Sequence, residues 1–244
     1  MSKTAATLIT LWLSLAGLPG QAQEANPERQ AMLDAIRESV RDTAPYTGLE
    51  TISDPVMRAM GSVPREAFVL PDYRHLAYDN TALPIEAGQT ISQPLIVALM
   101  TELLQVDKDA VVLEVGTGSG YQAAVLSGLV RAVYTIEIVD RLADSARQRL
   151  AALGYDNVTV RAGDGYDGWP EHAPFDAIVV TAAPDDIPPP LLKQLKPGGR
   201  LVIPVGPRYE GQELLVVRVD DQGNVLERAV LPVRFVPLTG DHTP

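Results

Sequence analysis

From residue 111 onward the chain alternates short apolar runs with amphipathic segments, and this alternation constrains the fold more than any other feature. The apolar runs have the length of strands: Val111–Val115, Val133–Ile138, Val158–Ala162, Ala177–Thr181 and Arg200–Val205. Apolar residues at helical spacing lie between them, at Tyr121–Leu129, Arg141–Leu153 and Pro188–Leu195. Strands that are apolar along their whole length predict a parallel sheet with helices on both faces.

The end of the chain predicts a different kind of strand pairing. Glu213–Val219 and Val225–Phe235 are strand-like, and the sequence Asp220-Asp221-Gln222-Gly223 between them is typical of a hairpin turn. The connection from Gly163 to Asp176 is mostly loop. We therefore predict an α/β fold with a doubly wound, mostly parallel sheet and an antiparallel C-terminal hairpin.

The residues before this sheet predict helices and one irregular segment. Residues 26–44 and 52–60 carry apolar side chains at helical spacing, and Pro94 stands where it can open a third helix. Residues 61–94 are rich in proline, glycine, tyrosine and aspartate, which favours ordered but irregular structure. These pieces are expected to add to the sheet, since nothing in the chain marks a second domain.

The first 22 residues resemble a secretory signal. Lys3 precedes the apolar stretch Ala5–Leu18, and small residues up to Ala22 lead into a polar sequence. The stretch is too short to span a membrane comfortably. The alternative explanation is a wrongly assigned start or a disordered tail. We expect a single domain over residues 23–240, with an N-terminal and substrate-side part (23–94) and an α/β core (95–240).

Charge and composition exclude several classes of function. The net charge of −11 at pH 7 disfavours binding to nucleic acid or to anionic membranes. The chain has no cysteine, so disulfides, thiolate metal sites and a cysteine nucleophile are excluded. We expect no nucleic-acid partner, no stable membrane insertion, no bound metal and a monomeric protein.

A glycine-rich turn follows the first predicted strand of the sheet. Gly116, Gly118 and Gly120 alternate with Thr117 and Ser119 before a helix begins. Glycine permits close approach to a ligand, and ligands of open α/β sheets bind beyond the carboxyl ends of the strands. Glu137 ends the next strand about 20 residues later, where an acidic side chain binds ribose hydroxyls. A tight turn without a ligand is the alternative explanation.

The spacing of these glycines resembles motif I of the Rossmann-like class I methyltransferases. It reads G-x-G-x-G after the acidic residue Glu114, whereas nicotinamide sites carry G-x-G-x-x-G. The resemblance implies that the loop contacts the methionine part of S-adenosylmethionine and that Glu137 binds its ribose. It implies an adenine contact at Asp164 and Gly165. The implied cofactor site also includes the following residues of the loop and the fourth strand: Glu114, Gly116, Thr117, Gly118, Gly120 and Thr181.

Four further segments resemble the protein-L-isoaspartate O-methyltransferase family. They are Val63–Val69, Ala77-Tyr78, Gly88–Pro94 and Val233–Leu238, and with the core they extend the resemblance over residues 45–238. The resemblance implies that Thr90, Ile91 and Ser92 contact substrate, with Ser92 as the active-site residue. Alternatives remain for single residues: Ser92 as a helix N-cap, Asp164 as a turn residue and Glu114 as a loop-ordering acid.

The chemistry of such a reaction agrees with the absence of an evident catalytic base. A carboxylate has a pKa of about 4, so it is ionised at neutral pH and attacks a methyl group without a base. The three histidines, His75, His172 and His242, show no triad-like setting. The family's methyl ester closes to a succinimide and reopens partly as aspartate, which repairs damaged proteins and peptides.

Three other functions stay open from the sequence. They are methylation of another substrate, binding of S-adenosylmethionine without catalysis, and nicotinamide oxidoreduction. The sequence Thr181-Ala182-Ala183-Pro184 lacks the motif of DNA amino-methylating enzymes. Because S-adenosylmethionine is made and kept in the cytoplasm, we expect the protein to work there, against the signal-like start.

Overall fold

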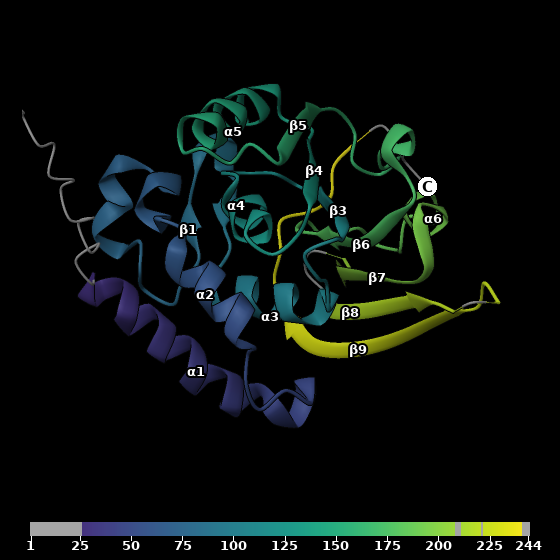
Figure 1. Ribbon diagram of the computed structural model, residues 1–244, viewed down its shortest axis with the longest axis horizontal. Coiled ribbons are helices and arrows are strands. Elements are labelled where there is room, and N and C mark those ends of the chain that lie inside the picture. The colour runs from purple at the N-terminus through teal and green to yellow at the C-terminus, as the bar shows by residue number, and fades with distance from the viewer. Residues whose placement is uncertain (1–25, 208–210, 221, 241–244) are drawn as a thin grey trace, which may run out of the picture.

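The computed structural model describes residues 26–207, 211–220 and 222–240. Its central sheet has seven strands in the order β5-β4-β3-β6-β7-β8-β9 (Figure 1). The strands are β3 (Val111–Val115), β4 (Ala132–Glu137), β5 (Val158–Ala162), β6 (Phe175–Val180), β7 (Leu195–Val205), β8 (Gln212–Val219) and β9 (Val225–Val233). Strands β5 to β7 pair in parallel, and β8 and β9 pair antiparallel. The predicted parallel sheet and C-terminal hairpin are confirmed.

The strand order reverses direction between β3 and β6. From β3 the chain moves outward to β4 and β5, then returns to place β6 on the other side of β3. Loops that leave the carboxyl ends of β3 and β6 therefore separate to opposite faces, which opens a crevice for a ligand.

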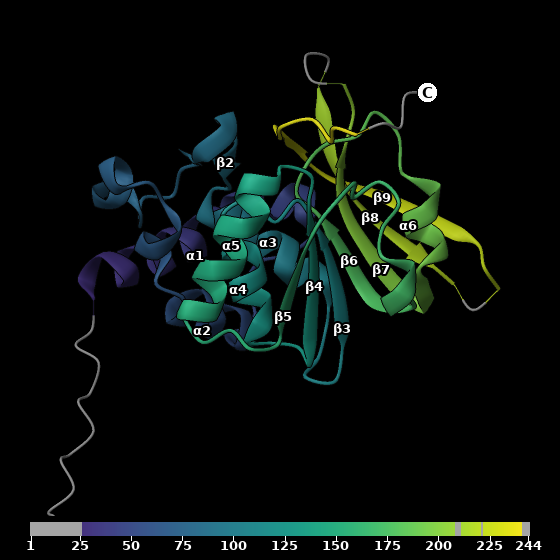
Figure 2. The same ribbon diagram turned by 90° about the horizontal axis from the view of Figure 1, so that it is seen from above.

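Helices cover both faces of the sheet, as the apolar strands predicted. Helices α3 (Pro94–Leu104), α4 (Tyr121–Ser127) and α5 (Asp140–Ala152) lie on one face, and the short α6 (Pro189–Lys193) lies on the other (Figure 2). Alternate residues of one strand enter different cores, so Val112 packs toward α3 and α4 while Leu113 packs with Trp169 and α6. The 3-10 helix η4 (Pro170–His172) interrupts the predicted loop between β5 and β6.

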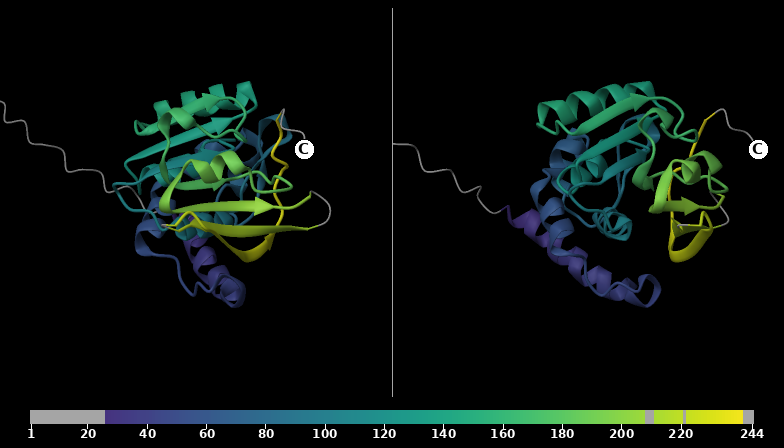
Figure 3. Two further views of the ribbon diagram at one scale, coloured as in Figure 1. Left: turned by 90° about the vertical axis from the view of Figure 1, so that its right-hand side faces the viewer. Right: turned by 45° about the vertical axis from the view of Figure 1, so that its right-hand side comes forward.

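Two further helices lie outside the α/β core. Helix α1 (Pro27–Thr47) packs against α3 and α2 (Asp54–Ser62), and the right panel of Figure 3 shows it running along the outer side of the molecule. Asn26 caps α1 by accepting from the amides of Glu28 and Arg29. No helix of the described residues has the length and apolarity that crossing a membrane requires. The signal-like residues 1–22 lie outside the described part of the chain.

The irregular segment before α3 is ordered, as predicted. It contains three 3-10 helices and one small hairpin, which are η1 (Arg65–Phe68), η2 (Pro71–Leu76), β1 (Leu83–Pro84), η3 (Glu86–Gly88) and β2 (Thr90–Ile91). The hairpin ends three residues before Pro94, so it places Ser92 between a strand and the start of a helix.

The expected helix at Pro188–Leu195 is wrong at its C-terminal end. The helix stops at Lys193, and Leu195 already pairs with Phe175 as the first residue of β7. Just after this point Nζ of Lys196 lies 2.7 Å from Oδ1 of Asp176 on the neighbouring strand β6. Gly198 and Gly199 follow within β7, where Gly198 has a φ of 77° and the register with β6 shifts.

Candidate active site

The glycine-rich loop leaves β3 in a conformation that only glycine adopts easily. Gly116, Gly118 and Gly120 have φ values of 96°, 52° and 88°. A Cβ at Gly116 would lie 2.4 Å from Oγ1 of Thr181, and that hydroxyl donates to the Gly116 carbonyl at 2.6 Å. The end of β6 therefore fixes the loop at close range and leaves no room for a side chain.

Glu137, the last residue of β4, fixes the other side of this loop. Its Oε2 accepts from the amide of Gly118 at 2.7 Å, and its Oε1 accepts from the amide of Val139 at 3.0 Å. The side chain is almost buried but lines the same cavity as Gly116 and Gly118. Each carboxylate oxygen has a further lone pair, so the group is able to accept hydrogen bonds from a ligand in that cavity.

Glu114 lies beneath the loop and is completely buried. Its Oε2 accepts from the hydroxyl of Thr135 at 2.5 Å, and that hydroxyl lies 2.6 Å from the hydroxyl of Thr117. Burial raises the pKa of Glu114 to about 8, and the nearby carboxylate of Glu137 acts in the same direction. At neutral pH Glu114 is therefore mostly protonated. Through Thr135 it connects the loop to β4, which agrees with the alternative that Glu114 is a loop-ordering acid.

This pKa predicts how stability depends on pH in the ligand-free protein. Between the unfolded-state pKa of 4.5 and the folded-state pKa of about 8, the folded state holds a proton that the unfolded state has lost. Stability from this site is therefore lost as the pH rises through that range, at up to about 1.4 kcal/mol per pH unit.

Glu114→Gln removes the titrating group and keeps its shape. We expect the stability of wild type relative to this variant to fall from pH 6 to pH 8, measured by urea unfolding at several pH values. A stability difference that stays constant over that range would contradict the raised pKa.

One cavity lies beyond the carboxyl ends of β3, β4 and β6. Five predicted cofactor residues contribute to its wall, together with apolar side chains at the end of β4: Gly116, Gly118, Glu137, Gly165, Thr181, Ile136, Ile138 and Val139. The segment Val236–Thr239 forms another wall, because Ala183 donates to the Val236 carbonyl and accepts from the Leu238 amide, each at 2.8 Å. The sequence analysis named Val233–Leu238 as part of the family resemblance but assigned it no role in the cofactor site.

Three predicted residues have positions that refine their expected roles. A Cβ at Gly165 would lie 2.4 Å from Cγ1 of Val115, so glycine is needed where this loop crosses β3. Asp164 accepts from the amide of Tyr166 at 2.9 Å, which agrees with the turn alternative. Gly120 packs toward α5, since a Cβ there would lie 3.2 Å from Leu150, and it lines none of the cavities described here.

The predicted substrate residues lie beside the loop. Thr90, Ile91 and Ser92 line a second cavity with residues of the cofactor side, namely Glu114, Gly116, Thr117, Gly118 and Thr181. Ser92 and Thr90 also line a third cavity with Ile96 and the segment Pro232–Val236. Thr90 and Thr181 contribute to all three cavities, so the spaces adjoin one another.

The alternative that Ser92 caps a helix is wrong. The N-cap of α3 is Gln93, whose side chain makes no capping bond. Asn80 takes that role from a distance, since its Oδ1 accepts from the amide of Leu95 at 3.0 Å. Ser92 therefore lines two cavities, and its hydroxyl does not cap α3.

A buried arginine behind Ser92 was missed by the sequence analysis. Arg65 is completely buried, and its Nε and Nη2 donate to the carbonyls of Ala77 at 2.9 Å and Ser92 at 2.7 Å. Its guanidinium stacks 4.6 Å from the ring centre of Tyr121, and burial lowers its pKa. The surrounding Val63–Val69 motif was noticed only as a resemblance, because a buried arginine has no sequence signal of its own.

The sheet order and the glycine loop with its acidic residue on β4 define this chain as a class I methyltransferase. The family model described as protein-L-isoaspartate(D-aspartate) O-methyltransferase matches residues 47–243. The chain belongs to that family.

Relatives and solved structures agree with this assignment. A protein-L-isoaspartate O-methyltransferase 2 of Syntrophobacter fumaroxidans is 55% identical over 98% of this chain and 98% of its own length. The corresponding Polaromonas protein is 59% identical over 86% of this chain and 99% of its own. A solved protein-L-isoaspartate O-methyltransferase is 30% identical, with a TM-score of 0.76, and covers 87% of this chain and 66% of that chain.

A more distant structure supports the fold. It is a Plasmodium falciparum protein, described as a putative protein-L-isoaspartate O-methyltransferase in complex with S-adenosyl-L-homocysteine. It is 23% identical to this chain, with a TM-score of 0.71, over 86% of this chain and 98% of its own.

Proposed function

We propose that this protein transfers a methyl group from S-adenosylmethionine to the carboxylate of L-isoaspartyl residues in damaged proteins and peptides. The methyl ester then closes to a succinimide, which begins repair. Family membership supports the reaction. The observation that carries it to this chain is the adjoining of two cavities, one beside Glu137 and one beside Ser92, at the glycine loop.

The residues at the first cavity fit S-adenosylmethionine. Gly116 and Gly118 bring bare backbone to its wall, and Gly165 keeps another wall free of a side chain. Glu137 offers carboxylate oxygens to ribose hydroxyls, and its negative charge suits a cationic donor. We assign the adjacent Asp164 to the adenine side and Thr117, with Glu114 beneath it, to the methionine side. The donor supplies an activated sulfonium methyl group.

The protein has mainly to orient the reactants and exclude water. The attacking carboxylate is already ionised at neutral pH, so no side chain needs to remove a proton. Val236–Thr239 and the hairpin residues Gln89 and Thr90 line the same cavity and shield it from water. We assign Ser92 to donate a hydrogen bond to the substrate carboxylate, with Thr90 and Ile91 beside it. Holding the reacting atoms in line is the largest contribution that such a site is able to make.

Transfer of a labelled methyl group to two matched peptides tests this function. One peptide contains isoaspartate and the other aspartate at the same position. We expect labelling of the isoaspartyl peptide alone, as a base-labile ester. If the protein binds S-adenosylmethionine and labels neither peptide, the substrate is a different one. Equal labelling of both peptides would contradict recognition of the isopeptide bond.

We also propose that the protein works in the cytoplasm, because its donor is made and kept there, and that it acts as a monomer. Cell fractionation with sequencing of the mature N-terminus tests the compartment. A mature chain that starts near Gln23 in an exported fraction would contradict it.

A further inference from the structure

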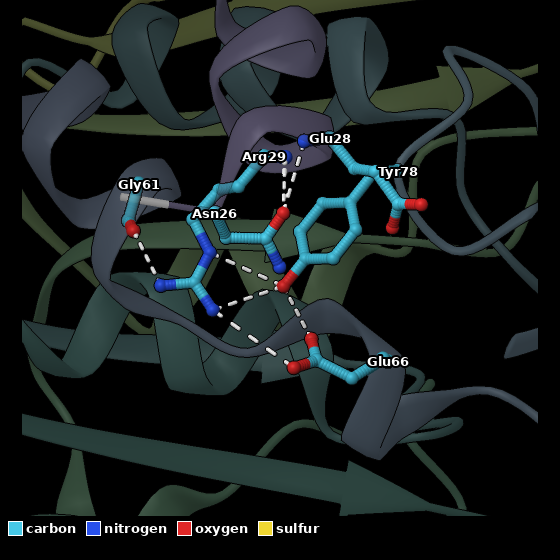
Figure 4. A network of polar contacts seen from close by, with 6 residues as sticks. All are labelled: Asn26, Glu28, Arg29, Gly61, Glu66 and Tyr78. Atoms are coloured by element: carbon cyan, nitrogen blue, oxygen red, sulfur yellow. Dashed lines mark hydrogen bonds and ion pairs between the residues drawn. The ribbon is translucent and has the colours of Figure 1, made fainter. Parts of the chain in front are cut away.

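Helix α1 lies before the segment that the family model matches and overlaps it only at Thr47. One of its side chains contacts the irregular segment that leads to Ser92. Arg29 donates from Nε at 3.1 Å and from Nη2 at 2.9 Å to the hydroxyl of Tyr78, and from Nη1 at 3.1 Å to the carbonyl of Gly61 (Figure 4). Its side chain is only 14% exposed. The Tyr78 hydroxyl in turn donates to the carboxylate of Glu66. All three nitrogens of this guanidinium therefore donate hydrogen bonds to residues outside α1.

A second polar contact joins α1 to the same segment two residues later. Nδ2 of Asn80 donates to the hydroxyl of Ser39 on α1 at 3.2 Å. Oδ1 of the same Asn80 accepts from the amide of Leu95, in the first turn of α3. A single side chain therefore connects α1 to the residue three positions after Ser92.

Ala77, the residue before Tyr78, is linked to Ser92 through a third side chain. The carbonyl of Ala77 and the carbonyl of Ser92 both accept from the buried guanidinium of Arg65. The segment Ala77–Asn80 is thus fixed by α1 at Tyr78 and Asn80. It supports Ser92 through Arg65 on one side and Leu95 on the other.

We propose that α1 is a positioning element of the active site, acting through Arg29 and Ser39 on the segment Ala77–Asn80 and thereby on Ser92. The inference rests on the proposed function, because Ser92 is assigned to the substrate carboxylate. Positioning is demanding in this reaction, since a displacement of about 1 Å is able to cost about 100-fold in rate.

The network keeps its hydrogen-bonding pattern at physiological pH. Burial and the hydrogen bond to Glu66 raise the pKa of Tyr78 to about 12. The phenol therefore stays neutral, accepts from Arg29 and donates to Glu66 at the same time. Replacing tyrosine with phenylalanine removes all three hydrogen bonds of this hydroxyl and keeps the ring, so Tyr78→Phe probes the network without changing the side chain's shape.

The test compares Arg29→Gln and Tyr78→Phe with Arg37→Gln in the full chain. Arg37 is a matched control because it lies on α1 and pairs only with the exposed Asp34 of the same helix among the described contacts. Steady-state kinetics with the isoaspartyl peptide, calorimetric binding of S-adenosyl-L-homocysteine and amide hydrogen exchange of residues 77–95 are measured for each.

We expect Arg29→Gln and Tyr78→Phe to raise KM for the peptide and lower kcat/KM about tenfold, with the affinity for S-adenosyl-L-homocysteine within about twofold of wild type. Exchange in residues 77–95 should be faster than in Arg37→Gln. A purely structural role would reduce the amount of active protein without changing KM. Kinetics and exchange equal to those of Arg37→Gln would overturn the positioning role. An inactive wild-type protein would overturn the proposed function instead, and exchange would still decide whether α1 orders the segment.

Discussion

Glu137→Ala is expected to weaken binding of S-adenosylmethionine about 100-fold. Hydrogen bonds to an ionised carboxylate are worth about 1.5–3 kcal/mol each, and about 1.4 kcal/mol corresponds to tenfold in affinity. The variant would lose the proposed ribose contacts. It would also leave the amides of Gly118 and Val139 without their acceptors, so the loop that forms the cavity wall would lose one of its two fixed sides.

Glu137→Gln separates these two effects. Its amide oxygen retains one acceptor, so we expect the loop to stay near its native position and the affinity to fall less than in the alanine variant. Isothermal calorimetry with S-adenosyl-L-homocysteine measures both variants, with thermal unfolding as a check on folding. Unchanged affinity in Glu137→Ala would remove the ribose assignment, whatever the loop does.

The parts of the fold that were predicted from the sequence are those set by neighbouring residues. The apolar run Val111–Val115 indicates a buried strand, and the glycines after it indicate an unusual backbone conformation. The predicted strand and the predicted start of the next helix therefore match β3 and α4. Glu137 was found because its distance from the loop along the chain is nearly fixed by one strand-helix-strand unit. The helix-strand boundary was wrong by two residues, because pairing of Leu195 with Phe175 on the neighbouring strand β6 sets where β7 begins.

The missed features depend on contacts between segments far apart in the chain. The segment Val236–Thr239 lies at the cavity because Ala183 pairs with Pro237. Neither Ala183 nor Pro237 is a residue type that indicates a ligand site. Asn80 caps a helix that begins 14 residues later, so a search for local capping residues favours Ser92 instead. At Gly120 an added Cβ would meet Leu150 of α5, so the motif identifies a backbone requirement at this position.

Ser92→Ala is expected to lower kcat/KM for the isoaspartyl peptide about 100-fold while the affinity for S-adenosyl-L-homocysteine stays within about twofold. The reason is positioning: without the Ser92 hydroxyl the attacking carboxylate is held less closely in line with the methyl group, and a misplacement of about 1 Å is able to cost about 100-fold in rate. The usual confounding effect, loss of a helix cap, does not apply here because Gln93 and Asn80 form the start of α3. The change in stability should therefore be small.

Two control variants make this result specific to the hydroxyl of Ser92. Ser62→Ala removes a serine hydroxyl that bonds only to the Ala59 carbonyl of its own helix among the described contacts, and it should leave kinetics unchanged. Ser92→Thr keeps a hydroxyl beside the cavity and should retain more activity than Ser92→Ala. If turnover of Ser92→Ala equals that of wild type, the substrate carboxylate takes its hydrogen bonds from other groups. Thr90 would then be the first to test, since it borders all three cavities.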